Sequence, residues 1–124
     1  MNNFDELIKV FFHMTLNIKL YHWQTTSYSR HKATDELFGN LIELIDKFVE
    51  VYIGRYERPQ FNDKTPINIQ RLSDEQAVKM INNYIKFLKT DIHKYINTSD
   101  TDLLNIRDEI LQHFNRTLYL FTLN

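Results

Sequence analysis

Cysteine is absent from this sequence of 124 residues, and glycine and proline occur only twice each. Without cysteine there is no disulfide framework, no thiolate metal site and no cysteine nucleophile, so any bound metal must be held by histidine and carboxylate side chains. The scarcity of glycine and proline removes most of the turn residues that a β-rich fold needs. What remains is a chain whose apolar residues recur at spacings of three and four, which is the periodicity of amphipathic helices.

The sequence also lacks a strong charge of one sign and a long apolar run. Fifteen Lys and Arg residues against sixteen Asp and Glu residues leave a formal net charge of −1, so a strong field for nucleic acid is missing and DNA binding is not expected. No apolar run approaches the roughly 20 residues that cross a bilayer. Acidic Asp5 and Glu6 precede much of the first apolar stretch, unlike the order of a secretion signal. We therefore expect a soluble, cytoplasmic protein.

Four segments carry the helical periodicity, and they span about residues 3–24, 31–57, 73–96 and 101–121. Asn3 with Glu6 and Ser73 with Gln76 have the spacing of a capping box, which predicts a helix start at each place. The polar stretches 25–30 and 97–100 are short enough to be turns between antiparallel helices.

Both prolines, Pro59 and Pro66, lie in the remaining connection, residues 58–72, which has no clear period of its own. At about 3.3 Å per residue this connection could span roughly 50 Å, enough to return along a bundle. One long connection between two short ones is typical of the ferritin-like arrangement. The sequence thus predicts a single all-α domain over residues 1–124, a ferritin-like four-helix bundle with a long crossover between its second and third helices.

The second predicted helix places four ionisable side chains on one face. At 100° per residue these groups fall within about 100° of arc; they are His31, Asp35, Asp46 and Glu50, and they share the face with Phe38, Ile42, Val49 and Ile53. An isolated carboxylate is costly to bury, so such groups on an apolar face usually pair or bind metal. The alternative is that the face lies at a wet rim and the carboxylates are solvated.

His22 belongs to the apolar stripe of the first helix and precedes the turn. If the first two helices are antiparallel, then His22, His31 and Asp35 converge. Two imidazoles and a carboxylate suit a divalent transition metal such as iron, or zinc in its place. Taken alone, His22 is more typical of a hydrogen-bonded core histidine.

Asp46 and Glu50 cannot reach that group within one chain, because eleven residues of helix rise about 16 Å. A two-fold axis across this face would bring the His22, His31 and Asp35 end of one subunit to the Asp46 and Glu50 end of its partner, forming two equivalent sites. A di-iron site inside the bundle is not expected, since no Glu in the sequence is followed three residues later by His.

The order of these residues resembles the ferroxidase signature of the Dps, or miniferritin, family. The matching residues are Tyr21-His22-Trp23, then His31 with Asp35, then Asp46 with Glu50. The resemblance implies a homo-oligomer with a two-fold interface on the first two helices, within a hollow dodecameric shell. It also implies iron storage, with oxidation of Fe(II) to Fe(III) at the intersubunit sites by hydrogen peroxide. Trp23 would resemble the family's oxidisable aromatic beside the metals, or it is a packed interface tryptophan.

The sequence therefore predicts a ferroxidase that binds iron and has the metal ligands His22, His31, Asp35, Asp46 and Glu50. The alternative is a catalytically inactive structural or packaging protein that keeps the helical scaffold and the dimer interface.

Overall fold

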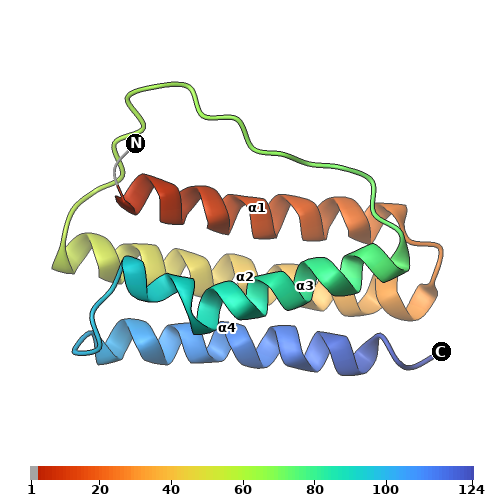
Figure 1. The fold of residues 1–124 in the computed structure, drawn as a ribbon. Helices are drawn as coiled ribbons and strands as arrows, with labels where there is room; N and C mark the ends of the chain where they lie inside the picture. The colour runs from red at the N-terminus through yellow and green to blue at the C-terminus, as the bar shows by residue number, and fades with distance from the viewer. Residues whose placement is uncertain (1–2) are drawn as a thin grey trace.

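The computed structural model describes residues 3–124, and within that part of the chain every regular element is a helix. The elements are α1 (Asn3–Gln24), α2 (Tyr28–Arg55), α3 (Asp74–Lys89), the short 3-10 helix η1 (Asp91–Lys94) and α4 (Thr101–Leu120). The four α-helices lie alongside one another as a bundle (Figure 1). This confirms the predicted all-α bundle.

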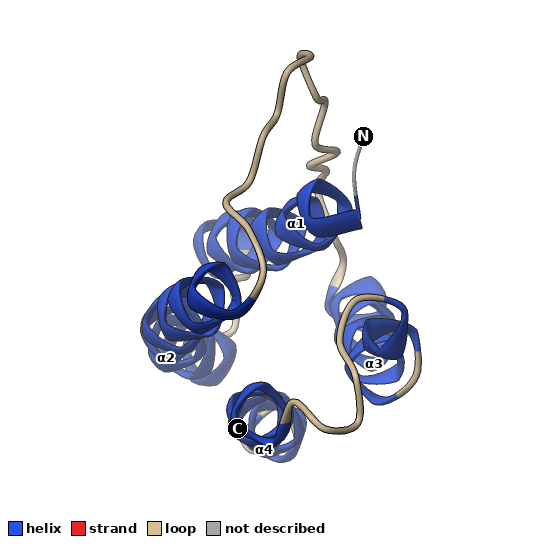
Figure 2. Ribbon diagram, turned by 90° about the vertical axis from the view of Figure 1, so that its left-hand side faces the viewer, coloured by secondary structure: helices blue, strands red, loops and turns tan. Residues whose placement is uncertain are grey.

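The long connection between α2 and α3 determines how the helices are directed. Helices α1 and α2 are antiparallel, as are α3 and α4, while the crossover of residues 56–73 runs back along the bundle so that α2 and α3 point the same way (Figure 1). Seen along the bundle, α2 lies between α1 and α4, and α3 lies on the opposite side from α2 (Figure 2). None of the helices in residues 3–124 is long and apolar enough to cross a membrane.

Side-chain caps mark the starts of α2 and α3. The hydroxyl of Ser27 accepts a hydrogen bond from the backbone N–H of Arg30, so α2 begins at Tyr28, three residues before the predicted start. Ser73 and Gln76 form the predicted capping box at the start of α3. Asn3, which was predicted to cap the first helix, is already a helical residue of α1 in the structure.

The third helix ends earlier than predicted. The hydroxyl of Thr90 donates a hydrogen bond to the carbonyl of Lys86 over 2.7 Å, and the next amide bond runs over three residues, from His93 N–H to the carbonyl of Thr90. The chain therefore tightens into η1 instead of continuing as α-helix to Ile96.

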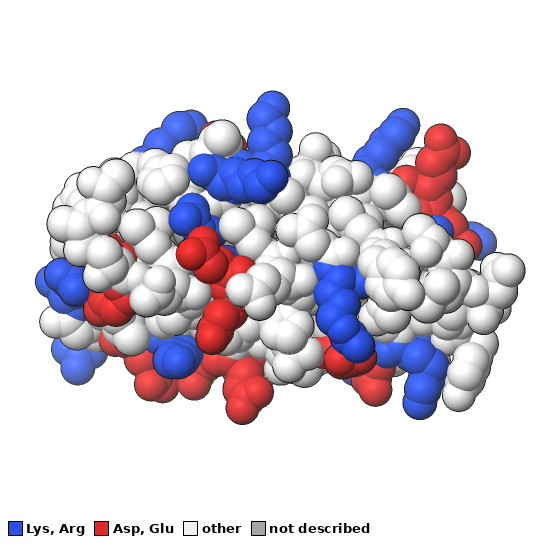
Figure 3. Space-filling view, turned by 90° about the horizontal axis from the view of Figure 1, so that it is seen from below, with Lys and Arg blue, Asp and Glu red and all other residues white. Residues whose placement is uncertain are grey.

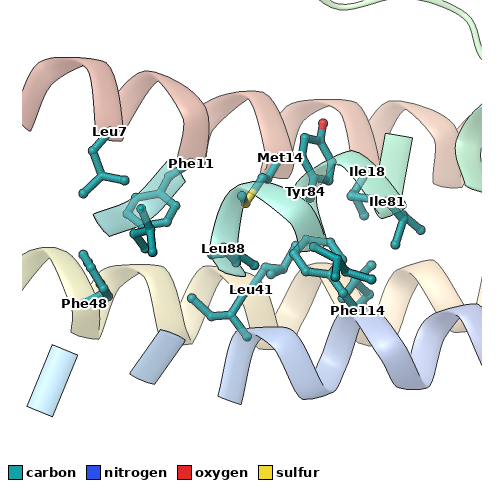
Figure 4. Close-up of a cluster of buried hydrophobic side chains, with 14 of the residues drawn as sticks. Leu7, Phe11, Met14, Ile18, Leu41, Phe48, Ile81, Tyr84, Leu88 and Phe114 are labelled. Carbon is teal, nitrogen blue, oxygen red and sulfur yellow. The ribbon is translucent and has the colours of Figure 1, made fainter. Parts of the chain in front are cut away.

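The core is formed by apolar side chains of all four helices (Figure 4). Between α1 and α2 the rings of Phe11 and Phe48 meet edge to face, with centroids 5.2 Å apart. Phe114 of α4 and Tyr84 of α3 are also in ring contact, at 5.6 Å. On α2, however, Ile42 lies outside this core and is 47% exposed. Helix α2 thus has a second apolar stripe, which faces outward beside α1.

The crossover is held against α1 by polar side chains. The buried carboxylate of Asp5 accepts hydrogen bonds from the backbone N–H groups of Gln60, at 2.8 Å, and Phe61, at 3.0 Å. Phe61 has a φ of 44°, a left-handed conformation that non-glycine residues adopt at some cost. Further along, the Asn17 amide donates to the carbonyl of Asn68 over 3.0 Å. These bonds keep the long connection along the bundle.

Replacing Asp5 by alanine is expected to destabilise the protein by about 1–3 kcal/mol, because two backbone donors lose their acceptor at a poorly hydrated position. Urea denaturation measures the change. Glu6→Ala is the matched control, since it removes the same charge from the same helix turn but from an exposed side chain. Equal losses in the two variants would show that the effect comes from the helix dipole and not from the crossover.

Candidate functional site

His22 and His31 meet where the chain turns from α1 into α2. His22 Nδ1 lies 2.8 Å from the carbonyl oxygen of His31, and His31 Nδ1 lies 3.0 Å from the carbonyl oxygen of His22. The two rings are stacked, with centroids 4.0 Å apart and planes 16° from parallel. His22 is buried, whereas His31 is exposed. The two residues thus form a reciprocal clasp across the turn.

This clasp determines which ring nitrogen is free. A carbonyl oxygen only accepts hydrogen bonds, so Nδ1 must carry the proton in both rings. Thr34 agrees with this, because its hydroxyl donates to the carbonyl of Arg30 over 2.7 Å and can accept from His22 Nδ1 over 3.1 Å. In the neutral rings Nε2 then keeps its lone pair. Histidines that ligate metals are typically held in this way.

Asp35 completes this half of the site. Its Oδ1 atom lies 3.9 Å from His22 Nε2, and its side chain is 66% exposed. That separation is too long for a hydrogen bond. Two ligand atoms that each lie about 2.1 Å from one ion are about 3.4 Å apart in tetrahedral geometry and at most about 4.2 Å apart, so a small shift of the exposed Asp35 side chain would bring both atoms to one ion.

Asp46 and Glu50 lie one turn apart on α2, and both are exposed. Their separation from Asp35 along the helix is about 16 Å for the eleven residues between Asp35 and Asp46. Within residues 3–124 no group of three or more histidine and acidic side chains is close enough to hold a metal ion. In the single chain the structure therefore places His22 beside both His31 and Asp35, without forming a metal site from these three side chains, and it leaves the Asp46 and Glu50 pair apart.

The surface between these two groups is apolar. Phe12 and Leu16 of α1 are 49% and 46% exposed, and Phe12 lines the same groove as Ile42 of α2. At the Asp46 end the surface is hollowed into a groove of about 420 Å³, lined by Ile8, Phe11, Phe12, Ile42, Ile45, Asp46, Val49, Pro59 and Phe61. In the isolated chain Asp35, Asp46 and Glu50 are exposed to solvent, which is the alternative that the sequence analysis left open. They nevertheless border a large apolar face.

Trp23 lies on this outer face and not in the core, with 67% of its surface exposed. The Nζ atom of Lys19 lies 5.5 Å from the centroid of the Trp23 ring and 4.7 Å from that of Phe38. Lys19 therefore bridges an aromatic residue of α1 and one of α2.

Charged side chains elsewhere on the surface are mixed in sign. Arg116 pairs with Glu36 at 2.6 Å and Arg107 with Asp108 at 2.8 Å. On the face shown in Figure 3, basic and acidic side chains are interspersed without an extended area of one sign. This arrangement agrees with the low net charge.

Residues 22–121 match DUF5856, a family of unknown function. The chain belongs to this family. It is similar to the "Uncharacterized 14.6 kDa protein in mobD-ri intergenic region" of Enterobacteria phage T4, with 32% identity over 102 residues, which are 82% of this chain and 74% of that protein. No solved structure matches the chain.

The assignment to the Dps family is wrong, because the chain matches DUF5856 and its T4 relative and no Dps protein. That assignment depended on a few residues between Tyr21 and Glu50. Antiparallel amphipathic helices that carry histidines near a turn and acidic residues along one face can produce such an order without common ancestry, whereas the DUF5856 match extends over most of the chain.

Thr34 is the site residue that the sequence analysis missed. It is fully buried and contacts the Nδ1 atom of His22. Threonine within an apolar helical pattern is ordinary, so its spacing carried no functional signal. Only the contact between the two helices in the structure identifies its role.

The clasp predicts a specific tautomer. In neutral His22 and His31, nitrogen NMR should show a protonated Nδ1 and an unprotonated Nε2, because each Nδ1 faces a carbonyl. Exposed His93 on η1, which has no such partner among the described contacts, is the control and should show the mixture of a free imidazole. A protonated Nε2 in either clasp histidine would remove that nitrogen from the set of metal ligands.

Proposed function

We propose that this protein binds Fe(II) at two equivalent sites shared between the subunits of a homodimer and oxidises it with hydrogen peroxide. The observation that supports this most directly is the clasp, in which Nδ1 of both His22 and His31 is engaged by a carbonyl and Nε2 of both is left for a metal. Asp35, at ligand spacing from His22 Nε2, adds an oxygen donor.

The second subunit supplies what one chain lacks. A two-fold axis across the α1/α2 face would place Asp46 and Glu50 of one subunit opposite the His22, His31 and Asp35 group of the other. Each site would then have two imidazole nitrogens and three carboxylates. The exposed apolar residues between the two groups would be buried in the same step, which favours association.

The donor set suits Fe(II) as the substrate. Imidazole and carboxylate ligands bind iron or zinc in the absence of thiolates, and zinc is therefore expected to compete for the same site. Oxidation of two Fe(II) ions supplies the two electrons that reduce one hydrogen peroxide molecule to water, and two protons are taken up. Carboxylates favour the Fe(III) product because they stabilise the higher charge.

The ferritin-like type of bundle belongs to this proposal. The single long crossover and the parallel α2 and α3 are what such a bundle requires. The dodecameric shell was implied only by the resemblance to Dps and loses its basis with that assignment. The shared sites require a dimer, and the cytoplasmic location stays a prediction.

A structural or packaging protein without turnover is the second candidate. It is favoured by the exposure of Asp35, Asp46 and Glu50 in the single chain, where the carboxylates need no metal. Such a protein would use the apolar α1/α2 face for assembly alone. Metal binding and oxidation therefore separate the two candidates, whereas dimerisation does not.

Replacing Glu50 by glutamine should weaken Fe(II) binding by at least about tenfold and slow oxidation, because one anionic ligand is lost while the shape is kept. Isothermal titration under nitrogen measures binding, and absorbance of the Fe(III) product measures oxidation. The control is Glu36→Gln, which makes the same change on the same helix but at a residue that pairs with Arg116 of α4. Equal behaviour of the two variants would exclude Glu50 from the site.

Mixed dimers test the shared geometry. A His31→Ala, Asp35→Ala chain keeps only the Asp46 and Glu50 half, and an Asp46→Ala, Glu50→Ala chain keeps only the histidine half, so each alone should be inactive. After co-assembly one of the two sites in every mixed dimer is complete. With random pairing, about half of the dimers are mixed and about a quarter of the wild-type sites return.

Native mass spectrometry verifies the pairing, and the oxidation rate should follow the fraction of mixed dimers. Verified mixed dimers without any recovered oxidation would contradict a shared site. Wild-type dimers that neither bind nor oxidise Fe(II) would support the structural candidate.

A further inference from the structure

The outer face of α1 and α2 has a projecting tryptophan at one end and an apolar groove at the other. Phe12, Leu16, Lys19 and Trp23 follow one another on α1 at spacings of four, three and four, so they form one stripe. The groove lies beside Phe12, about eleven residues of helix away from Trp23. Phe38 of α2, which shares Lys19 with Trp23, shows that the tryptophan lies on the α1/α2 side.

In the dimer of the proposed function, the two-fold axis brings Trp23 of one subunit level with the apolar groove of its partner. The rings of His22 and His31 are in contact, and so are those of Phe11 and Phe48. On antiparallel helices the first pair puts Trp23 level with about position 30 of α2 and the second with about position 36, so the average is about position 33. The axis that exchanges Asp35 and Asp46 crosses α2 near position 40 or 41. From this average Trp23 lies about 11 Å from the axis, and symmetry carries it to about position 48 of the partner, within a range of about 45 to 51 set by the two ring pairs. The groove occupies that level, since Ile45 and Val49 line it.

The charges of the two ends also match. Lys19 accompanies Trp23 at one end, and Asp46 lies within the apolar lining of the groove at the other. A ligand for this groove should thus present a large apolar group next to a positive charge, and the second copy of the chain carries both in this order. Because the axis is two-fold, the Trp23 end of each subunit faces the groove of the other, and the contact occurs twice per dimer.

We infer that Trp23 of each subunit inserts into the apolar groove of its partner, so that it anchors the dimer and positions the adjacent His22 against the partner's carboxylates. This inference rests on the dimer of the proposed function. Trp23 is here a positioning residue: it is next to a metal ligand in the sequence, and its ring is a suitable anchor because a large aromatic side chain in a pocket contributes strongly to an interface.

The sequence contains one tryptophan, so its fluorescence reports on this position alone. On dilution of the wild-type protein, the emission should move to longer wavelength as dimers dissociate into monomers, with the mass followed by analytical ultracentrifugation. Val49→Lys should leave the emission at the long wavelength and weaken the dimer by at least about tenfold, because a charge enters the groove. The control Leu123→Lys changes an exposed apolar residue near the C-terminus and should keep both properties.

Two further variants separate anchoring from general packing. Trp23→Ala should weaken the dimer by at least about tenfold, whereas Trp23→Phe should restore most of the affinity because a ring still fills the groove. Helical circular dichroism of the isolated chains checks that each variant folds. A verified dimer whose tryptophan emission stays that of a solvated indole would overturn the inference.

The outcome for iron is read separately. Glu50→Gln should keep the short-wavelength emission of the dimer while Fe(II) binding falls. If the wild-type dimer shows the buried tryptophan but no Fe(II) binding, the groove assignment stands and the proposed function fails. If Fe(II) is oxidised by a dimer with a solvated tryptophan, the proposed function stands and the groove assignment fails.

Discussion

The reciprocal clasp between His22 and His31 fixes the register of α1 against α2, and much of the molecule depends on that register. Each ring bonds to the other residue's backbone carbonyl across a turn of only three residues, 25–27. With the helices locked at this end, Phe11 meets Phe48 further along the core (Figure 4). The same register aligns the outward stripes of the two helices, so one set of hydrogen bonds acts on the α1/α2 part of the core, on the orientation of the two imidazole rings and on the apolar outer face.

Local signals in the sequence were sufficient for most of the fold. The four apolar stripes and the Ser73 capping box predicted the helices and the start of α3, because periodicity and caps act within a few residues. The errors arose where two local interactions compete. Helix α2 begins before the predicted position because Ser27 caps it from within the polar stretch. Helix α3 ends before Ile96 because the Thr90 hydroxyl donates a hydrogen bond to a backbone carbonyl near the helix end. The Asp5 anchor of the crossover spans more than fifty residues and has no local signal.

The candidate site was predictable only in part for the same reason. Spacing on one helix placed Asp46 with Glu50, and the short turn placed His22 near His31. The orientation of the rings depends on backbone carbonyls and on Thr34, which no pattern of side chains encodes. The family was misjudged because the order of a few polar residues was taken as ancestry, although geometry alone can impose such an order on antiparallel helices. Membership in DUF5856 does not change the geometry of the histidines. The proposal of iron binding therefore rests on coordination chemistry and no longer on the resemblance to Dps.

If the proposed dimer forms over this face, metal binding and dimerisation are linked thermodynamically. In the single chain Asp35, Asp46 and Glu50 are hydrated, so an interface over this face would remove water from three carboxylates on each subunit. Without a cation that desolvation opposes association, and the apolar stripes must offset it. A divalent ion in each site cancels much of the repulsion and bonds to the same carboxylates, so a ligand that binds only the dimer shifts the equilibrium toward it. A purely structural dimer would have no such compensation, and its acidic groups would weaken the contact that its apolar residues make.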